Sequence, residues 1–225
     1  MKTAVVIGST GLIGSILVQK LAQDGSWSQV LAICRKQTVW QNPKIRTLLF
    51  DFTHWDSFDV QIKSFAGMNT SIDFFCALGT TLAAAGSEEA FKKIDLEATI
   101  QFVKMAKRCK AERVIVVSAL GANQNSSQFY LKTKGEMEQV SLSLHRTGIY
   151  FLRPSLLLGD RTTFRFFERL AIIAFPLYSF FLVGPLKKYR PVSATAVAKV
   201  MVDIAAKKTA VATFVENEDI LNWKF

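Results

Sequence analysis

A glycine pattern close to the amino end of the chain constrains the fold more than any other feature. Residues 3–7 form a short apolar run, TAVVI, and GSTGLIG follows at once, with Gly8, Gly11 and Gly14 three residues apart. A strand, a glycine turn and a helix in this order are typical of a dinucleotide-binding unit, in which the helix N-terminus faces a pyrophosphate. We expect Gly8 to permit the tight turn, Gly11 to let the backbone approach the pyrophosphate, and Gly14 to let helix and strand pack closely.

Short apolar segments alternate with helix-length segments along the rest of the chain. Strands are predicted over residues 4–7, 30–33, 46–50, 72–76, 114–117, 150–152 and, more weakly, 211–215, and helices over residues 12–23, 88–108, 128–146 and 194–206. The strands are continuous apolar runs, which is typical of a sheet covered on both faces. This order predicts a single α/β domain over residues 1–225, built on a doubly wound parallel sheet of the Rossmann type.

Charge and cysteine content restrict the class of partner. Lysine and arginine number 28 against 18 acidic residues, and the formal net charge of +10 favours anionic ligands. The basic residues are dispersed rather than arranged in a stripe with aromatic residues, so we expect no nucleic-acid partner. The spacing of Cys34, Cys76 and Cys109 suits neither disulfides nor a metal, and no other cluster predicts a metal site. The amino end carries no secretory signal, and we expect a cytoplasmic protein.

One apolar segment, residues 170–183 with the sequence LAIIAFPLYSFFLV, lies in the last third of the chain. It is too short to span a membrane, and Pro176 interrupts it. We expect residues 155–193 to form a small C-terminal lobe over the substrate, with the apolar segment as its lid. Two alternatives stay open: a homodimer interface in place of a monomer's lid, and peripheral membrane contact through residues 164–183.

The residues after the second, third and fourth predicted strands indicate the cofactor. A carboxylate after the second strand would bind the ribose 2′-hydroxyl of NAD, but Arg35 and Lys36 stand there, and Arg35 can pair with the 2′-phosphate of NADP. Asp51 ends the third strand close to the expected adenine position, although an ordinary turn or helix cap explains it nearly as well. Gly79 after the fourth strand would let the cofactor pass close to the backbone. We therefore predict NADP(H) as the cofactor.

Three polar residues predict the chemistry. Ser118 follows the fifth predicted strand, and Tyr130 and Lys134 form a Y-x-x-x-K pattern on a predicted helix further along the chain. Residues four apart share one face of a helix. A nearby ammonium group stabilises a phenolate and lowers the pKa of a tyrosine, which gives an acid or base that works near neutral pH. Ser118 would hold the substrate oxygen, Tyr130 would exchange the proton, and Lys134 would also bind ribose hydroxyls of the cofactor.

These motifs resemble the short-chain dehydrogenase/reductase superfamily, in the atypical branch of the Tat-interacting oxidoreductase family. The matching stretches are VVIGSTGLIGS, CALGTT, EEAFKKID, VSALGAN, FYLKTKGEMEQV, LRPSLLLGDR and YRPVSATAVAKVM, which together span most of the chain. The resemblance implies the same roles for the residues above, and it places Pro154 and Leu157 beside the nicotinamide. Leu82 and Ser155 depart from the branch, which usually has arginine and glycine there, and the missing charge argues against an anionic substrate.

The sequence thus predicts an NADP(H)-dependent oxidoreductase that acts on a small carbonyl or alcohol. The predicted cofactor contacts are Gly8, Ser9, Thr10, Gly11, Leu12, Ile13, Arg35, Lys36, Asp51, Phe52, Leu78, Gly79, Thr80, Tyr130, Lys134, Pro154 and Leu157. A sugar-nucleotide epimerase or dehydratase is less favoured, because the chain is short for the lobe that such a site needs. The alternative from another class is a non-catalytic protein in which NADP(H) occupancy changes an interaction surface. We expect His54 and His145 to be ordinary surface or core histidines.

Overall fold

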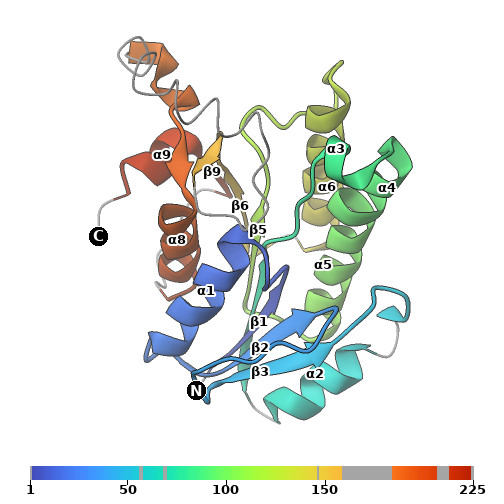
Figure 1. Ribbon diagram of the computed structural model, residues 1–225, viewed down its shortest axis with the longest axis vertical. Coiled ribbons are helices and arrows are strands. Elements are labelled where there is room, and N and C mark those ends of the chain that lie inside the picture. The colour runs from blue at the N-terminus through green and yellow to red at the C-terminus, as the bar shows by residue number, and fades with distance from the viewer. Residues whose placement is uncertain are drawn as a thin grey trace.

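Seven parallel strands form one sheet through the middle of the molecule (Figure 1). The computed structural model describes residues 2–55, 58–67, 70–145, 147–158, 184–206 and 213–223. The strands are β1 (Lys2–Ile7), β2 (Trp27–Cys34), β3 (Ile45–Leu49), β4 (Ser71–Cys76), β5 (Arg113–Val117), β6 (Ile149–Arg153) and β9 (Phe214–Glu216). Their order across the sheet is β3-β2-β1-β4-β5-β6-β9. The strand order reverses between β1 and β4, which confirms the predicted doubly wound sheet of the Rossmann type.

Helices cover both faces of this sheet (Figure 1). On one face lie α1 (Leu12–Gln23) and α8 (Ala194–Ala206), and on the other lie α2 (Phe58–Ala66), α5 (Thr99–Arg108) and α6 (Phe129–Leu144). The shorter elements are α3 (Leu82–Ala85), α4 (Glu88–Lys92), the π-helical turn η2 (Lys93–Ala98) and α9 (Asn217–Leu221). The helix predicted over residues 88–108 therefore consists of α4, η2 and α5 in direct succession.

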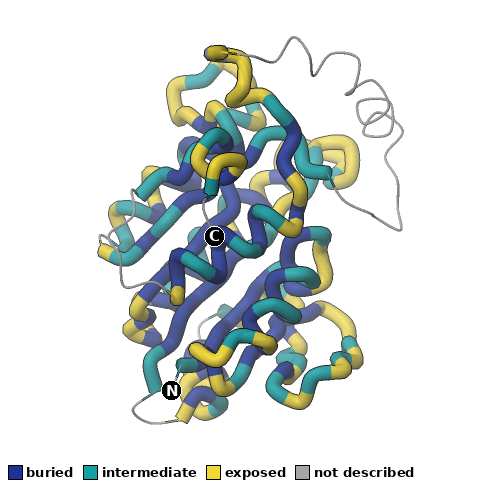
Figure 2. The backbone as a smooth tube through the Cα atoms, turned by 90° about the vertical axis from the view of Figure 1, so that its left-hand side faces the viewer, coloured by how far each residue is buried: buried dark blue, intermediate teal, exposed yellow. Residues whose placement is uncertain are grey.

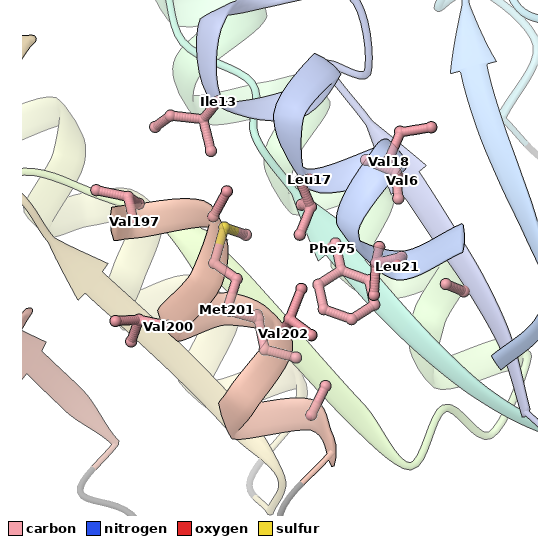
Figure 3. Close-up of a cluster of buried hydrophobic side chains, with 14 of the residues drawn as sticks. Val6, Ile13, Leu17, Val18, Leu21, Phe75, Val197, Val200, Met201 and Val202 are labelled. Atoms are coloured by element: carbon pink, nitrogen blue, oxygen red, sulfur yellow. The ribbon is translucent and has the colours of Figure 1, made fainter. Parts of the chain in front are cut away.

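The strands are apolar on both sides because both sides are buried. In β1, Val6 packs toward α1 and α8, whereas Val5 belongs to the cluster on the α5 side. Figure 3 shows side chains of α1 and α8, among them Leu17 and Met201, gathered over the first face. Each such side chain contributes roughly 1.5–3 kcal/mol when fully buried. The strands are the most buried part of the tube in Figure 2, and the exposed residues gather in the connections and on outer helix faces.

Several described elements differ from the predictions, and β2, α2 and the seventh strand are examples. β2 begins at Trp27, earlier than predicted, because the indole is buried and donates from Nε1 to Asp73 Oδ2 at 3.0 Å. α2 is absent from the prediction, since its short apolar stripe, with Phe58 and Ile62 at its centre, is too brief for a helical period to stand out. The seventh strand is described at Phe214–Glu216, and residues 211–212 of the predicted strand lie outside the described residues.

The predicted C-terminal lobe is described only at its two ends. β7 (Leu157–Leu158) and β8 (Val192–Ser193) form a second, two-stranded parallel sheet, and the 3-10 helix η3 (Gly184–Tyr189) precedes β8. Ser155 Oγ donates to the carbonyl of Arg190 at 2.5 Å, which ties the two ends together. Residues 159–183 lie outside the described residues, and with them the whole segment 164–183 for which a lid, dimer or membrane role is predicted.

Candidate cofactor and catalytic site

The glycine turn lies where the strand order of the sheet reverses. Gly8 follows β1 with a φ of +75°, a backbone conformation that glycine adopts without strain. A Cβ atom on Gly8 would stand 2.5 Å from the carbonyl oxygen of Ala77, in the segment that follows β4. The segments after β1 and β4 are therefore in close contact. In an open parallel sheet, the crevice outside the carboxyl ends of the strands at such a point is where ligands bind.

Gly11 and Gly14 shape the N-terminus of α1. A Cβ atom on Gly14 would lie 2.0 Å from the carbonyl oxygen of Gly8, so only glycine lets the helix begin this close to the turn. Gly11 is exposed, its N–H donates to the Gly8 carbonyl at 3.0 Å, and no described side chain caps the helix there. This arrangement fits a diphosphate, because the free N–H groups and the dipole of a helix N-terminus favour negative charge.

The other predicted residues of the turn have different surroundings. Thr10 is exposed, Leu12 is half-buried, and Ile13 is buried in the core. Ser9 is also buried: its hydroxyl donates to a carbonyl at the end of β2 at 2.7 Å and lies 3.1 Å from Cys34 Sγ. The side chains of Ser9 and Ile13 thus hold the turn in place, and these two residues can meet a cofactor only through their backbone amides.

A hollow of about 290 Å³ lies beyond the ends of β2 and β3. It is lined by Arg35, Leu49, Phe50, Asp51, His54, Phe58 and Gln61. The structure thus brings together Arg35 and Asp51, which the sequence predicts as cofactor contacts, and it adds His54, which the sequence interpretation set aside. Lys36 is exposed and is not among the described lining residues. A guanidinium group at the rim of such a hollow fits a phosphate.

The side chains of Asp51 and Phe52 have structural partners. Asp51 Oδ1 accepts hydrogen bonds from the hydroxyl of Thr53 at 2.6 Å and from its N–H at 3.0 Å, and these bonds lower the pKa of the carboxyl. The turn that the sequence offers as the alternative role of Asp51 is therefore present. Phe52 has a φ of +67°, and its ring stacks on Trp55 with the centroids 5.9 Å apart. Phe52 thus belongs to an aromatic cluster beside the hollow.

The segment after β4 leads to a buried acid that the sequence interpretation missed. Leu78 packs on the core and Gly79 is exposed, while the N–H of Thr80 donates to Asp95 Oδ2 at 2.8 Å. Asp95 lies in the π-helical turn η2 and is fully buried. One signal could have identified it. Asp95 stands four residues after the buried Phe91, within the apolar stripe of a predicted helix, where a carboxylate requires a partner.

Lys134 of α6 is the partner of Asp95. Its Nζ lies 2.7 Å from Asp95 Oδ1, and both side chains are buried. Burial by itself would lower the pKa of Lys134, but the negative charge of Asp95 and the hydrogen bond to it outweigh this effect, so that the pKa is raised. Lys134 therefore carries a positive charge beside the segment that follows β4.

Tyr130 lies one helical turn before Lys134 on α6. Its side chain is 41% exposed, and its ring packs against Phe91 with the centroids 5.7 Å apart, so the phenol is accessible to a ligand. Ser118, directly after β5, is buried, and its Oγ has no hydrogen-bond partner within the described part of the chain. A buried hydroxyl without a partner is costly, and a polar ligand atom would satisfy it.

The residues predicted to contact the nicotinamide follow β6. Pro154 is buried and its carbonyl accepts the N–H of Leu120 at 2.9 Å, whereas Leu157 is half-buried in β7. Leu82 is exposed at the start of α3, and Gly121 turns the chain after β5 with a φ of +80°. The predicted lid, residues 170–183, lies outside the described residues.

The parallel sheet, the glycine turn at its point of reversal and the hollow beside Arg35 define a dinucleotide-binding protein of the Rossmann class. A family model described as NAD(P)H-binding matches residues 8–165. The chain belongs to this NAD(P)H-binding family and, within it, to the atypical short-chain dehydrogenases/reductases that resemble the FMP52 proteins.

Several relatives carry the name "Protein FMP52, mitochondrial". The one from Debaryomyces hansenii is 33% identical over 207 residues, which cover 91% of this chain and 88% of the relative. The one from Candida albicans is 36% identical over 159 residues, which cover 69% of this chain and 67% of the relative. These names contradict the predicted cytoplasmic location. That prediction was wrong because it rested on the lack of a secretory signal, which does not distinguish the cytoplasm from the interior of an organelle.

Solved structures show the same fold. A UDP-glucuronic acid 4-epimerase from Bacillus cereus in complex with NAD matches with a TM-score of 0.68 at 17% identity, covering 96% of this chain and 76% of that one. The oxidoreductase ylbE from Lactococcus lactis matches with a TM-score of 0.66 at 16% identity, covering 98% of this chain and 95% of that one.

Within the described residues, no helix has the length and hydrophobicity to cross a membrane. The same residues contain no group of three or more potential metal ligands.

Proposed function

We propose that this protein is an NADP(H)-dependent oxidoreductase that acts on a small carbonyl or alcohol. The observation that carries the proposal is a buried, charged Lys134 one helical turn after an accessible Tyr130. A glycine turn that fits a diphosphate and the unpartnered hydroxyl of Ser118 support it. Membership of an NAD(P)H-binding family supports the class of cofactor.

Each residue has a separate task in this proposal. When bound, NADPH would supply the hydride that the carbonyl carbon accepts. Ser118 donates a hydrogen bond that holds the carbonyl oxygen, and Tyr130 gives its phenolic proton to that oxygen. Lys134 stabilises the negative charge left on the phenol. In the reverse direction, Tyr130 accepts the proton of the alcohol.

The preference for NADP(H) over NAD(H) is proposed to depend on Arg35. Its guanidinium group lines the hollow beyond β2 and β3 and can pair with a 2′-phosphate. In fluorescence titrations, we expect NADPH to bind at least about tenfold more tightly than NADH, a difference of about 1.4 kcal/mol. Arg35→Ala should remove most of this difference, and Lys107→Ala, which removes an exposed positive charge of α5, should retain it. Equal affinities of the unaltered protein for the two cofactors would contradict the role of Arg35.

Turnover distinguishes the enzyme from a non-catalytic NADP(H)-responsive protein. Tyr130→Phe removes the proton but keeps the ring on Phe91, so it should abolish NADPH oxidation with any active aldehyde or ketone and leave NADPH binding largely intact. Tyr150→Phe, which alters a half-buried tyrosine of β6 packed on the core, serves as the matched control and should retain turnover. If a carbonyl panel never oxidises NADPH above background, and NADPH instead alters binding to a partner or to liposomes, the non-catalytic function is supported.

We also propose a mitochondrial location, because the relatives carry that word in their names. Co-purification of the tagged chain with mitochondria in cell fractionation would test it, and recovery in the soluble cytosolic fraction alone would contradict it. The finer resemblance to the Tat-interacting oxidoreductase family is supported by the sequence motifs around Ser118, Tyr130 and Lys134.

A further inference from the structure

The hollow beyond the ends of β2 and β3 contains a histidine that is held by a short chain of hydrogen bonds. The hydroxyl of Thr53 donates to Asp51 Oδ1 at 2.6 Å, and Thr53 Oγ1 lies 2.7 Å from His54 Nδ1. The bonds from Thr53 lower the pKa of the Asp51 carboxyl, so this group is ionised and accepts hydrogen bonds without donating any. His54 lines the hollow together with Arg35.

These bonds determine which nitrogen of His54 carries the proton. A hydroxyl group has a single proton, and Thr53 gives it to Asp51, so the contact between Thr53 Oγ1 and His54 Nδ1 requires a proton on Nδ1. In a neutral imidazole with its proton on Nδ1, the other nitrogen, Nε2, is a hydrogen-bond acceptor. The side chain of His54 is exposed at the hollow, so Nε2 is open to a ligand.

The rest of the hollow suits a planar base. Leu49, Phe50 and Phe58 give it apolar walls, and Leu49 is 53% exposed, so part of this apolar surface is open. Gln61 also lines the hollow, but its amide can turn to present either its oxygen or its NH₂ group, so it does not distinguish one base from another. In NADP(H), one ribose carries both the 2′-phosphate and the adenine. A hollow in which Arg35 pairs with the phosphate therefore also has the adenine within reach.

We propose that His54 selects the base of the cofactor, because its Nε2 accepts a hydrogen bond from the exocyclic amine of adenine. This inference rests on the proposed function, and it makes His54 a specificity-determining residue with no part in the chemical step. Hypoxanthine has a carbonyl oxygen where adenine has the amine, so two acceptors would face each other. The imidazole cannot avoid this conflict by moving its proton to Nε2, because the bond to Thr53 keeps the proton on Nδ1.

The test compares NADPH with its hypoxanthine analogue in fluorescence titrations at about pH 8.5, where imidazole side chains are ordinarily neutral. The unaltered protein should bind NADPH about tenfold more tightly than the analogue, because the analogue leaves polar groups unpaired. His54→Phe keeps a planar ring but has no acceptor, so it should reduce this ratio to about twofold or less. Gln61→Ala, the matched control in the same hollow, should retain the ratio. If His54→Phe retains it as well, another group such as Asp51 recognises the base, and the proposal is overturned.

A second measurement tests the position of the proton without any ligand. The chain has two histidines, so the ¹⁵N NMR signals of His54 are those that disappear in His54→Phe. At the same pH, these signals should show the proton on Nδ1 of His54. Thr53→Val keeps the shape of the side chain but removes the hydroxyl, so the proton should then be shared between the two nitrogens. A proton on Nε2 in the unaltered protein would overturn the proposal.

The same titrations separate this inference from the proposed function. If NADPH does not bind to the unaltered protein, the proposed function is contradicted, and this inference with it. If NADPH binds but its hypoxanthine analogue binds equally well, only the role of His54 is contradicted. Arg35→Ala should lose the preference for NADPH over NADH and keep the preference for adenine over hypoxanthine, because the two preferences depend on different side chains of the hollow.

Discussion

Two glycines are required where the glycine turn and helix α6 meet their neighbours. A Cβ atom on Gly14 would lie 2.0 Å from the carbonyl oxygen of Gly8, and a Cβ on Gly135 would lie 2.1 Å from the backbone nitrogen of Gln124. In both cases the obstacle is backbone, which cannot rotate away as a side chain can. Gly25, by contrast, has no heavy atom within 4 Å of its Cβ position. Glycine is therefore required at positions 14 and 135, where a Cβ atom would meet backbone, but not at position 25.

Gly14→Ala should destabilise the protein and weaken cofactor binding together. Overpacking of this kind costs about 1–3 kcal/mol, and here it also displaces the turn that would hold the diphosphate. Gly25→Ala, the matched control, should change the free energy of unfolding by less than about 0.5 kcal/mol. Urea denaturation and NADPH fluorescence titration measure the two effects. Equal stability of the two variants would show that the α1 N-terminus is not packed as described.

At the scale of the element, α6 is the helix on which the proposed chemistry depends. Tyr130, Lys134 and Glu138 follow one another at intervals of four residues and so lie on one face. Glu138 is buried and accepts two hydrogen bonds from Arg153, from Nε at 2.9 Å and from Nη2 at 2.6 Å. Arg153 Nη1 also donates to Glu216 of β9 at 2.8 Å. The helix is thereby attached to the ends of β6 and β9.

Arg153→Ala should cost far more stability than the loss of a surface ion pair. It leaves the carboxylate of Glu138 buried without its partner, for which about 3–5 kcal/mol is typical. The control is Lys63→Ala, which breaks the half-exposed pair of Lys63 with Asp59 and should cost less than about 1 kcal/mol. Chemical denaturation of both variants gives the comparison. Similar losses in the two would mean that the bond between Arg153 and Glu138 does not hold α6.

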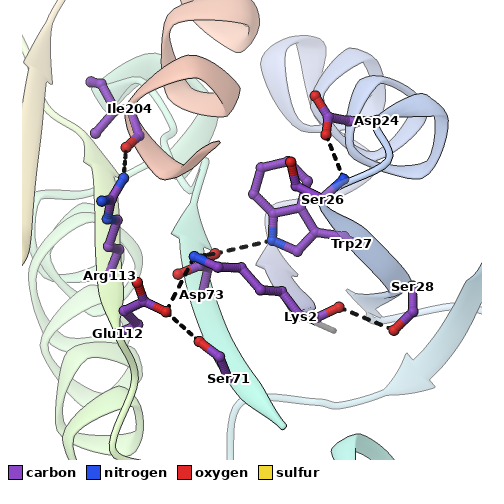
Figure 4. A network of polar contacts seen from close by, with 10 residues as sticks. All are labelled: Lys2, Asp24, Ser26, Trp27, Ser28, Ser71, Asp73, Glu112, Arg113 and Ile204. Atoms are coloured by element: carbon purple, nitrogen blue, oxygen red, sulfur yellow. Dashed lines mark hydrogen bonds and ion pairs between the residues drawn. The ribbon is translucent and has the colours of Figure 1, made fainter. Parts of the chain in front are cut away.

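At the scale of the whole molecule, the two edges of the sheet have different roles. The carboxyl ends of the strands carry the glycine turn and the catalytic candidates, whereas the amino ends carry a polar network around Asp73 (Figure 4). Lys2 Nζ lies 3.3 Å from Asp73 Oδ2 and 3.2 Å from Glu112 Oε2, so it joins β1 to β4 and to the residue that precedes β5. Burial raises the pKa of Asp73 to about 6, and the charge of Lys2 only partly opposes this.

The raised pKa of Asp73 predicts that stability falls as pH rises. The folded protein binds this proton more tightly than the unfolded chain does, so the fall occurs between about pH 4 and about pH 6, and the stability from this group is level above that range. The free energy of unfolding is expected to fall by about 3 kcal/mol over this pH range. Asp73→Asn, which retains an acceptor for Trp27, should abolish it and leave NADPH affinity unchanged. Asp24→Asn, at the end of α1, should retain the fall. Parallel stability curves for the two variants across this pH range would contradict the prediction.

The sequence by itself was sufficient for features that depend on residues close together in the chain. The glycine spacing after the first strand, the apolar runs of the sheet and the spacing of Tyr130 and Lys134 each reflect a local backbone geometry. Their order along the chain was enough to predict the doubly wound sheet, because alternating strands and helices have few other ways to bury both faces.

Only the tertiary structure decided which distant residues meet. The pairing of Asp95 with Lys134, the bond of Arg153 to Glu138 and the hollow shared by Arg35 and His54 join separate elements. No local pattern specifies such pairings, because a charged side chain selects its partner according to what the fold buries beside it. Asp95 is inconspicuous in the sequence for this reason: it becomes part of the site only because the fold buries it against Lys134.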